Sequence, residues 1–442
     1  MPFAVLISLV WALLPRPATA SRLESPHTGF DVIAYDVAME PDLRHASIRG
    51  TETIRMKVKE DGLVGLAFSP NALSITKASL NGRRIAVRST DEAITFEPAT
   101  PLAKGADVTL SFAFRGKPRR GFETVPDGLY TSYFACDWMV CLQDSPGDKA
   151  RLALAITAPT GWSTIAPGRL VGSRAGRHGT TIHRWRSDRP YSPYLYAFAA
   201  GVLRKATVHS TAGELTYLDA TGGHADFSKA FKETPSIVTF LSSKAGLALP
   251  KPFAQLLVPG HEAQEAASLS LIGAAALQRD LSAPESQWLL VHELSHQWWG
   301  NLVTCASWRD FWLNEGFATF MTAAWKEQRF GKAAYEAELD VARRRLAAAR
   351  EKGFDKPLTW EGDYPSLGTR RAVQYSKGAL FLDSLRKAMG EEAFWSGIRR
   401  YTRAHAGGTV TSEDFQRSMQ HGSARDLSPL FATWVFGHSP KH

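Results

Sequence analysis

The pattern of apolar and polar positions changes once along the chain, near residues 222–223. Before this point, short segments alternate apolar and polar residues, are rich in β-branched side chains and end at turn residues. Asn81 and Gly82 form one of these turns and indicate a hairpin. The pattern is typical of short β-strands. We expect them at 48–59, 75–87, 93–98, 106–116, 152–159 and 194–203.

Beyond residue 223, apolar residues recur at helical spacing in longer segments. These are 225–245, 284–300, 311–330, 332–352, 372–389, 391–406 and 411–421. The two patterns together predict an α+β protein. We expect an N-terminal β-sheet domain at 21–222 and a mainly α-helical domain at 223–442.

The N-terminus carries an apolar run from Phe3 to Leu14, which is too short to span a bilayer. The small residues Ala18-Thr19-Ala20 follow it and fit a cleavage site, so we predict a signal peptide at 1–20 and export to the periplasm or beyond. A buried N-terminal strand is the alternative. No later stretch has the length and apolar character of a membrane helix, so we expect no integral membrane segment after signal removal.

Composition excludes several classes of protein. The chain has 442 residues, of which 44% are hydrophobic and 21% charged, as in an ordinary globular protein. The net charge is +9, but the basic residues are scattered apart from 115–121 and 342–350. We therefore expect a basic surface and no nucleic-acid site.

The three cysteines of the chain are relevant to the cellular compartment, because disulfide bonds form mainly outside the cytoplasm. Cys136 and Cys141 are close enough to close a small loop in an exported protein, and Cys305 would then remain free and buried. Two free core thiols are the alternative to this pairing.

The candidate chemistry lies in the sequence VHELSHQWWG (291–300). On a helix, His292 and His296 share one face, one turn apart, and can present both imidazoles to one ion. Glu293 follows the first histidine, where its carboxylate can reach a water molecule on that ion. Glu315 comes after 18 intervening residues, on a second helix, and is the candidate third ligand. Two nitrogen ligands, one carboxylate and an open position are typical of catalytic Zn²⁺, so we predict one zinc ion per chain. Two helix histidines facing a polar groove are the structural alternative.

The sequences HELSHQWWGNLVT (292–304) and WLNEGFAT (312–319) resemble the HExxH-x18-E signature of the aminopeptidase N-like gluzincin metallopeptidases. The resemblance implies a saddle-like β domain followed by a thermolysin-like zinc catalytic domain. It also implies a short form, without the C-terminal helical domain of larger members. Further similar segments are 35–54, 141–159, 374–401, 411–419 and 429–440.

The same resemblance implies roles for individual residues. His292, His296 and Glu315 would hold the zinc ion, and Glu293 would take a proton from its water and pass it to the leaving amine. Tyr375, in QYSKGA, would donate to the developing oxyanion. Without the family, Tyr375 would be an ordinary core residue.

Two positions depart from the family. Its exopeptidases carry a Gly-Ala-Met-Glu-Asn strand whose glutamate pairs with the substrate's free α-amine. A gapless comparison back from residues 270–272 places Ala267 at that glutamate, so the motif is lost by this interpretation. Glu265 is a candidate replacement in substrate binding, and a surface carboxylate is its alternative. Thr322 stands where a glutamate that supports a zinc-bound histidine is frequent.

We therefore expect a zinc metallopeptidase that hydrolyses peptide bonds by zinc-activated water, with atypical and possibly non-aminopeptidase recognition of the N-terminus. One alternative is a zinc-holding protein that binds peptides with little catalysis. Another is a hydrolase of a non-peptide substrate. Glu293 and Tyr375 together favour an enzyme, since binding alone requires neither.

Overall fold

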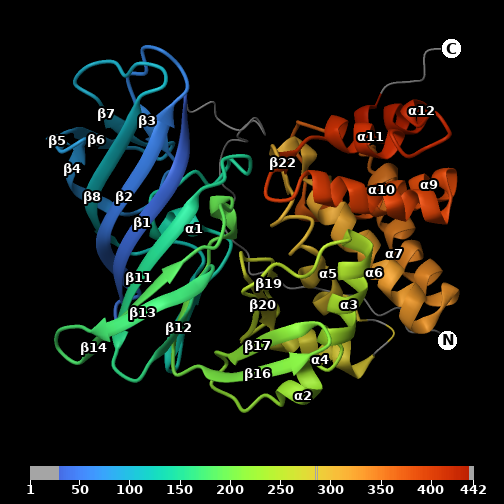
Figure 1. Ribbon diagram of the computed structural model, residues 1–442, viewed down its shortest axis with the longest axis horizontal. Coiled ribbons are helices and arrows are strands. Elements are labelled where there is room, and N and C mark those ends of the chain that lie inside the picture. The colour runs from blue at the N-terminus through green and yellow to red at the C-terminus, as the bar shows by residue number, and fades with distance from the viewer. Residues whose placement is uncertain (1–28, 284, 286, 438–442) are drawn as a thin grey trace.

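The structure is a computed structural model that describes residues 29–283, 285 and 287–437. A β-rich N-terminal part stands beside a mainly helical C-terminal part (Figure 1). This is the α+β architecture expected from the sequence. The predicted signal peptide at 1–20 lies outside the described residues.

The N-terminal part is built on an eight-stranded sheet in the order β13-β14-β11-β1-β2-β8-β4-β5. The central strands β1 and β11 are parallel, and the other neighbouring strands of this sheet are antiparallel. The bounds are β1 Phe30–Asp42, β2 Ser47–Val58, β4 Ser74–Leu80, β5 Arg83–Arg84, β8 Asp107–Gly116, β11 Arg151–Pro159, β13 Arg169–Ala175 and β14 Thr180–Arg186.

Alternation along the central strands places one face of this sheet in a core. In β2, Ile54, Met56 and Val58 are buried while the residues between them reach the surface. This period of two is what a half-buried strand requires. The predicted hairpin is confirmed, because Asn81 and Gly82 both have positive φ and join β4 to β5.

Two smaller sheets complete the N-terminal part. One has the order β12-β15-β10-β9 and the other β3-β7-β6. Their bounds are β3 Leu66–Phe68, β6 Ala86–Ser89, β7 Ile94–Glu97, β9 Phe122–Val125, β10 Gly128–Thr131, β12 Ser163–Ile165 and β15 Ala199–Gly201. The predicted strand at 194–203 is thus only partly correct. Its first residues form a 3₁₀ turn at Pro193–Leu195, since Pro193 cannot donate to a strand ladder.

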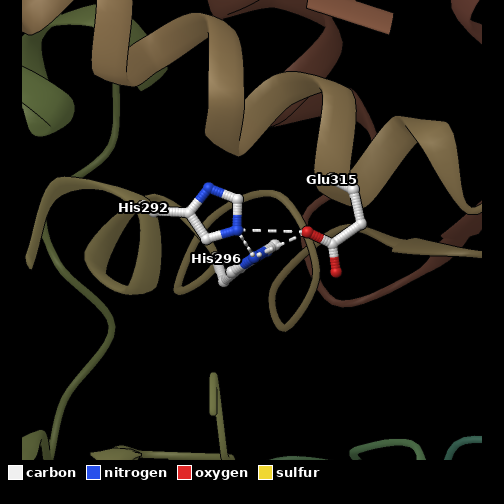
Figure 2. A group of neighbouring side chains, drawn as sticks. All are labelled: His292, His296 and Glu315. Carbon is white, nitrogen blue, oxygen red and sulfur yellow. Dashed lines mark hydrogen bonds and ion pairs between the residues drawn. The ribbon is translucent and has the colours of Figure 1, made fainter. Parts of the chain in front are cut away.

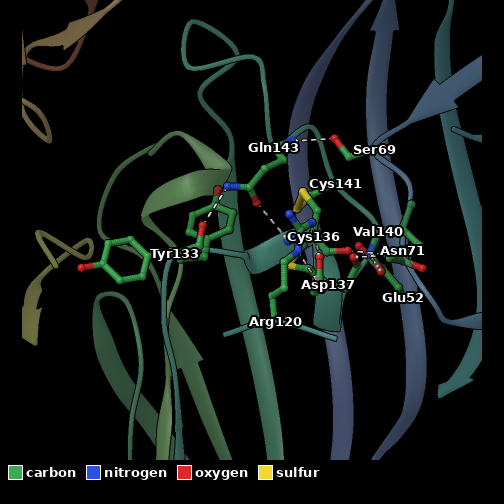
Figure 3. The surroundings of a disulfide bond; sticks show 12 residues. Glu52, Ser69, Asn71, Arg120, Tyr133, Cys136, Asp137, Val140, Cys141 and Gln143 are labelled. Carbon is green, nitrogen blue, oxygen red and sulfur yellow. Dashed lines mark hydrogen bonds and ion pairs between the residues drawn. A yellow bond between two sulfur atoms is a disulfide. The ribbon is translucent and has the colours of Figure 1, made fainter. Parts of the chain in front are cut away.

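The structure joins Cys136 to Cys141 in a disulfide bond, and Cys305 is free and buried. The bond spans the short helix α1 (Ala135–Trp138), and Figure 3 shows its surroundings. Gln143 crosses the loop: its Oε1 accepts from the Cys136 backbone N–H at 3.3 Å, and its Nε2 donates to the Tyr133 carbonyl at 2.8 Å. The loop therefore fixes the backbone of Tyr133.

A five-stranded sheet, in the order β16-β17-β18-β20-β19, joins the two parts of the protein. The sequence pattern predicted no element between 245 and 284, so the strands of this sheet beyond residue 223 were not expected. The predicted domain boundary between 222 and 223 falls within the chain segment that this sheet spans, and it stays a prediction. The bounds are β16 Arg204–Ser210, β17 Gly213–Asp219, β18 Ala254–Val258, β19 Ala263–Gln264 and β20 Leu269–Gly273.

The helices pack around one large apolar core that includes Trp299, Trp312 and Phe317. Most agree closely with the predicted segments. They are α2 Phe227–Ala230, α3 Thr234–Ala245, α4 Ala274–Ser282, α5 Leu289–Ser295, α6 Trp312–Phe330, α7 Lys332–Glu351, α8 Leu367–Arg371, α9 Gly378–Met389, α10 Glu391–Ala404, α11 Ser412–Gln420 and α12 Ser428–Phe431. A 3₁₀ turn lies at Trp308–Asp310, π-helical segments lie at Ala372–Lys377 and Ala432–Phe436, and a two-residue pair joins β21 (Thr304–Cys305) to β22 (Thr409–Val410).

Close packing positions α6 against α9. A Cβ at Gly316 would lie 2.9 Å from the Cα of Gly378, so the two backbones meet where neither residue has a side chain. Gly316 directly follows Glu315, and this contact therefore fixes the start of α6 relative to the segment that carries Tyr375. Among the described residues, no helix combines the length and apolar character needed to cross a membrane.

Candidate metal centre

Helix α5 carries the HELSH sequence through the interior of the helical part. His292, Glu293 and His296 are all buried, as is every residue of α5. The helix ends one residue earlier than the second histidine. His296 still has helical backbone angles (φ −61°, ψ −21°), and its N–H donates to the His292 carbonyl at 3.3 Å. The two imidazoles therefore keep the one-turn spacing that the sequence predicts.

Figure 2 shows His292, His296 and Glu315 pointing toward one another. The two Nε2 atoms lie 3.1 Å apart, and Oε2 of Glu315 lies 3.1 Å from Nε2 of His292 and 3.4 Å from Nε2 of His296. One ligand atom from each residue lies within 4.8 Å of the others. The structure thus brings together all three predicted ligands.

The hydrogen bonds around the histidines fit a metal ion. Nδ1 of His296 lies 3.1 Å from the Trp299 carbonyl, and donation to this acceptor leaves a lone pair on Nε2 that faces the centre of the site. Gly300 makes room for this arrangement, because a Cβ there would lie 3.1 Å from Nδ1 of His296. Gly300 also has φ +141°, which side chains rarely allow. Two imidazoles and one carboxylate are the donor set of catalytic zinc sites.

Thr322 gives no support to the first histidine. Its hydroxyl donates to the Ala318 carbonyl at 2.9 Å, within α6. Among the described residues, Nδ1 of His292 has no hydrogen-bond partner. The ring is held instead by aromatic contacts, with Trp288 stacked on it at a centroid distance of 3.9 Å.

Burial and mutual charge shift the three pKa values strongly. Burial lowers the pKa of His292 to about 4. Burial also opposes the charged form of His296, but the Glu315 carboxylate outweighs it and raises the pKa to about 10. Burial disfavours the charged form of Glu315 as well, yet His296 and the bond from His292 lower its pKa. The site therefore favours positive charge, and a metal cation would replace the proton that His296 carries beside Glu315.

Glu293 is buried beside this centre. Burial raises its pKa well above the usual range, and Glu265 and Glu315 raise it further while His296 opposes them. Its Oε2 has no hydrogen-bond partner among the described residues. A buried carboxylate with a raised pKa and a free oxygen fits the exchange of a proton with a reacting molecule.

Tyr375 approaches the same histidines from the π-helical segment at Ala372–Lys377. Its ring lies parallel to that of His292, with centroids 5.9 Å apart and an interplanar angle of 4°. Burial raises the pKa of Tyr375 well above its usual range, and Glu315 adds to this effect. The hydroxyl therefore remains protonated and can donate a hydrogen bond. π-helical turns are rare and frequent at functional sites.

Glu265 lies beside this centre, and its burial excludes the alternative of a surface carboxylate. Only 9% of its surface is exposed, and burial raises its pKa, with His296 and Glu315 as its charged neighbours. Ala267, which the gapless comparison placed at the amine anchor, instead packs in the core of the N-terminal part with 0% exposure. The structure therefore assigns the position near the metal centre to Glu265, two residues earlier.

Three residues that the sequence analysis did not single out hold this segment in place. Asn301 donates from Nδ2 to the carbonyls of Glu265 and Ala266, at 2.9 and 3.3 Å. Gln264 accepts from the Tyr133 backbone N–H at 2.8 Å, and the Tyr133 hydroxyl donates to the Ala263 carbonyl. Asn301 lies inside the segment 292–304 that resembles the family. This resemblance was the only feature of the sequence that could have indicated a role for Asn301.

The chain matches known proteins over most of its length. Residues 263–434 match the Peptidase family M1 domain. Aminopeptidase N of Lactobacillus helveticus is 24% identical over 433 residues, which cover 91% of this chain and 50% of that protein. Probable aminopeptidase 2 of Sulfurisphaera tokodaii is 24% identical over 429 residues, which cover 91% and 53%. The chain thus spans about half the length of these curated relatives.

Solved structures share the fold. The crystal structure of an M1 zinc metallopeptidase from Deinococcus radiodurans has a TM-score of 0.78 at 23% identity, covering 94% of this chain and 96% of that one. A variant of such an enzyme from the same organism, with a bound Tyr-Ser-Ala substrate, gives 0.78 at 22% identity. Fold and site define a two-part protein of the M1 metallopeptidase type. These matches support a member of the aminopeptidase N-like gluzincin family.

Proposed function

We propose that this protein is a zinc-dependent metallopeptidase with an atypical site for the substrate N-terminus. The observation that carries the proposal is the convergence of His292, His296 and Glu315 within 4.8 Å, with the carboxylate of Glu293 buried beside them. The three ligands would hold one zinc ion per chain. Bound there, the ion would supply Lewis-acid activation of water and of the substrate carbonyl.

The chain's own residues supply the proton transfers. Glu293 takes a proton from the attacking water and delivers it to the leaving amine nitrogen, for which its place beside the ligands and its unpartnered Oε2 among the described residues suit it. Tyr375 donates its hydroxyl hydrogen to the oxygen that becomes negative as the carbonyl is attacked. Glu293 is buried and Tyr375 half-buried, and such interactions are stronger there than in bulk water.

Glu265 is the proposed anchor for the substrate's α-ammonium. A charged amine that leaves water needs a buried partner of opposite charge, and Glu265 offers one beside the metal centre. Its neighbours differ from the Gly-Ala-Met-Glu-Asn motif, since Glu262, Gln264 and Ala266 replace glycine, methionine and asparagine in this register. Recognition is therefore atypical in the residues around the anchor, while the carboxylate itself is kept.

We also propose that the protein is exported. The sequence of residues 1–20 supports this, and so does the disulfide bond between Cys136 and Cys141, because such bonds persist mainly in oxidising compartments.

The metal assignment predicts that His296→Ala loses zinc. The purified wild-type protein should contain about one zinc ion per chain, as a single catalytic site requires. The variant keeps only His292 and Glu315, and we expect it to retain a small fraction of that metal after dialysis. Elemental analysis of both proteins is the measurement. Replacing the exposed His178 by alanine is the control and should leave the zinc content unchanged. Full occupancy in His296→Ala would show that the ligand set is wrong.

Tyr375→Phe tests the proposed chemistry and the role of the hydroxyl together. We expect kcat to fall on the order of a hundred-fold, the usual contribution of one oxyanion donor, with KM little changed. Steady-state hydrolysis of a peptide library by wild type and variant measures this. The control is Tyr364→Phe, because Tyr364 bonds to Gln374 outside the centre. Wild type that hydrolyses no peptide would contradict the proposed function, and equal rates for Tyr375→Phe would contradict the role of Tyr375.

A further inference from the structure

Lys149 of the N-terminal part binds the turn that follows α5 in the helical part. Its Nζ donates to three backbone carbonyls, at 3.2 Å to Asn301, 3.3 Å to Leu302 and 2.8 Å to Gly408. An ammonium group has three donors, so these acceptors can use all of them. Asn301 and Leu302 come shortly after His296, and Gly408 directly precedes β22. Lys149 therefore fastens two separate segments of the helical part to the N-terminal part.

The backbone on both sides of Lys149 is fixed. The carboxylate of Asp148 accepts from the Val32 N–H of β1 at 3.2 Å, and the Ala150 N–H donates to the Tyr191 carbonyl at 3.0 Å. The side chain of Lys149 is half-buried, and a cation that leaves water needs compensating acceptors. The three carbonyls supply them only while the turn stays in place. The lysine thus extends from a rigid base and holds the turn in one position.

Asn301 connects this contact to residues 264–267, which we call the anchor segment. Lys149 holds the backbone carbonyl of Asn301, and the side chain of Asn301 donates from Nδ2 to the carbonyls of Glu265 and Ala266. Only 2% of the surface of Asn301 is exposed, which leaves its side chain little room to move. One residue therefore joins the lysine of the N-terminal part to the backbone that carries the Glu265 carboxylate.

The two ends of the anchor segment are bonded to the N-terminal part directly. Nε2 of Gln264 donates to the Tyr194 carbonyl at 3.2 Å, and the Ala267 N–H donates to the Leu195 carbonyl at 2.8 Å. The bonds from Asn301 lie between these two points. Displacing Asn301 would therefore release the middle of the segment, where the carboxylate beside the metal centre is attached.

We propose that Lys149 is a positioning residue for recognition of the substrate N-terminus. Lys149 fixes Asn301, Asn301 fixes the backbone of Glu265, and Glu265 binds the α-ammonium of the substrate. The inference rests on the proposed anchor role of Glu265. It adds a residue of the N-terminal part that touches no substrate and acts through Asn301.

Lys149→Met tests this role, because it removes the three donors and keeps most of the side-chain length. We expect KM for a tripeptide with a free N-terminus to rise at least about tenfold, since misplacing a group by about 1 Å can cost about a hundred-fold. The kcat should change little, because the anchor binds the ammonium equally in the ground state and the transition state. A purely structural role would instead reduce the active fraction, which lowers kcat and leaves KM unchanged.

Calorimetry provides a readout that does not depend on hydrolysis. The affinities of the tripeptide and its N-acetylated form are measured for each protein, and their ratio should fall at least about tenfold in Lys149→Met. Lys149→Arg keeps a charged donor and should retain most of the ratio. Lys104→Met is the matched control, since Lys104 is exposed in the N-terminal part and its loss changes the net charge equally.

A double variant tests whether Lys149 acts through Asn301. The double variant Lys149→Met, Asn301→Ala should lose no more of the affinity ratio than Asn301→Ala alone, because residues that act in series are not additive. Additive losses, or an undiminished ratio in Lys149→Met, would overturn the role of Lys149 alone. Equal affinity of wild type for both peptides would overturn the Glu265 anchor together with this inference. If wild type hydrolysed no peptide, the proposed peptidase function would fail, and the affinity ratios would still decide the role of Lys149.

Discussion

Glu293→Gln should abolish peptide hydrolysis while the protein keeps its zinc. Glutamine has nearly the same shape as glutamate but cannot accept a proton from water at neutral pH. A positioned general base contributes roughly 10²–10⁴-fold to the rate, so we expect kcat to fall by at least that factor. The site favours such a role, because Glu293 is buried with a raised pKa and one oxygen without a partner in the described structure.

Two measurements separate this chemical role from a structural one. Zinc content and thermal unfolding of Glu293→Gln should match wild type, because His292, His296 and Glu315 are untouched. Glu361→Gln is the control: Glu361 is exposed and pairs with Arg309 at 3.4 Å, so its loss should leave kcat unchanged. Loss of zinc along with activity in Glu293→Gln would assign the residue to metal retention instead.

The metal centre was the part of the site most accessible to sequence reasoning. His292 and His296 are placed by the period of one helix, and Glu315 by a second helix that packs against the first. The helix period and the spacing to the second helix can both be recognised directly in the amino-acid sequence. Tyr375 was found through the resemblance alone, because nothing in QYSKGA predicts a π-helical turn that brings its ring parallel to His292.

The position of Glu265 could not be read from the sequence in the same way. A gapless comparison shifts every side chain if its starting point is wrong by a residue or two, and the segment between β19 and β20 has no internal landmark. The hydrogen bonds from Asn301 and the contact of Ala267 with the N-terminal core fix its register in the structure. These contacts link residues far apart in the chain. Part of the five-stranded sheet was missed because β18 and β20 are short and buried along their whole length, so they lack the alternation that predicts a half-buried strand.

Correcting the register by two residues reverses an expectation about the substrate. With Ala267 at the anchor, a free N-terminus would enter the site unpaired, and blocked peptides would be cleaved at least as well. With Glu265 there, the buried carboxylate and the substrate ammonium would stabilise each other. The corrected placement therefore favours peptides with free N-termini.

Glu265→Ala should remove this preference. Truncating one partner of a buried charge pair costs about 2–5 kcal/mol, so kcat/KM for free peptides should fall at least roughly thirtyfold. Cleavage of N-acetylated peptides of the same sequence should be slow in both proteins and unaffected by the change. Side-by-side kinetics on the free and acetylated pair provides the measurement, and Glu265→Gln distinguishes the loss of charge from the loss of volume.

Ala267→Glu decides between the two registers. Ala267 is fully buried among the apolar residues of the N-terminal core, and its N–H donates to the Leu195 carbonyl at 2.8 Å. A carboxylate there would be buried without a partner, so we expect Ala267→Glu to lower the thermal stability and give no gain in preference for free N-termini. If Ala267→Glu instead increased that preference while Glu265→Ala left it intact, the anchor position would be 267 after all. The two positions differ physically, because Glu265 feels the charges of His296 and Glu315 while Ala267 packs in the N-terminal core.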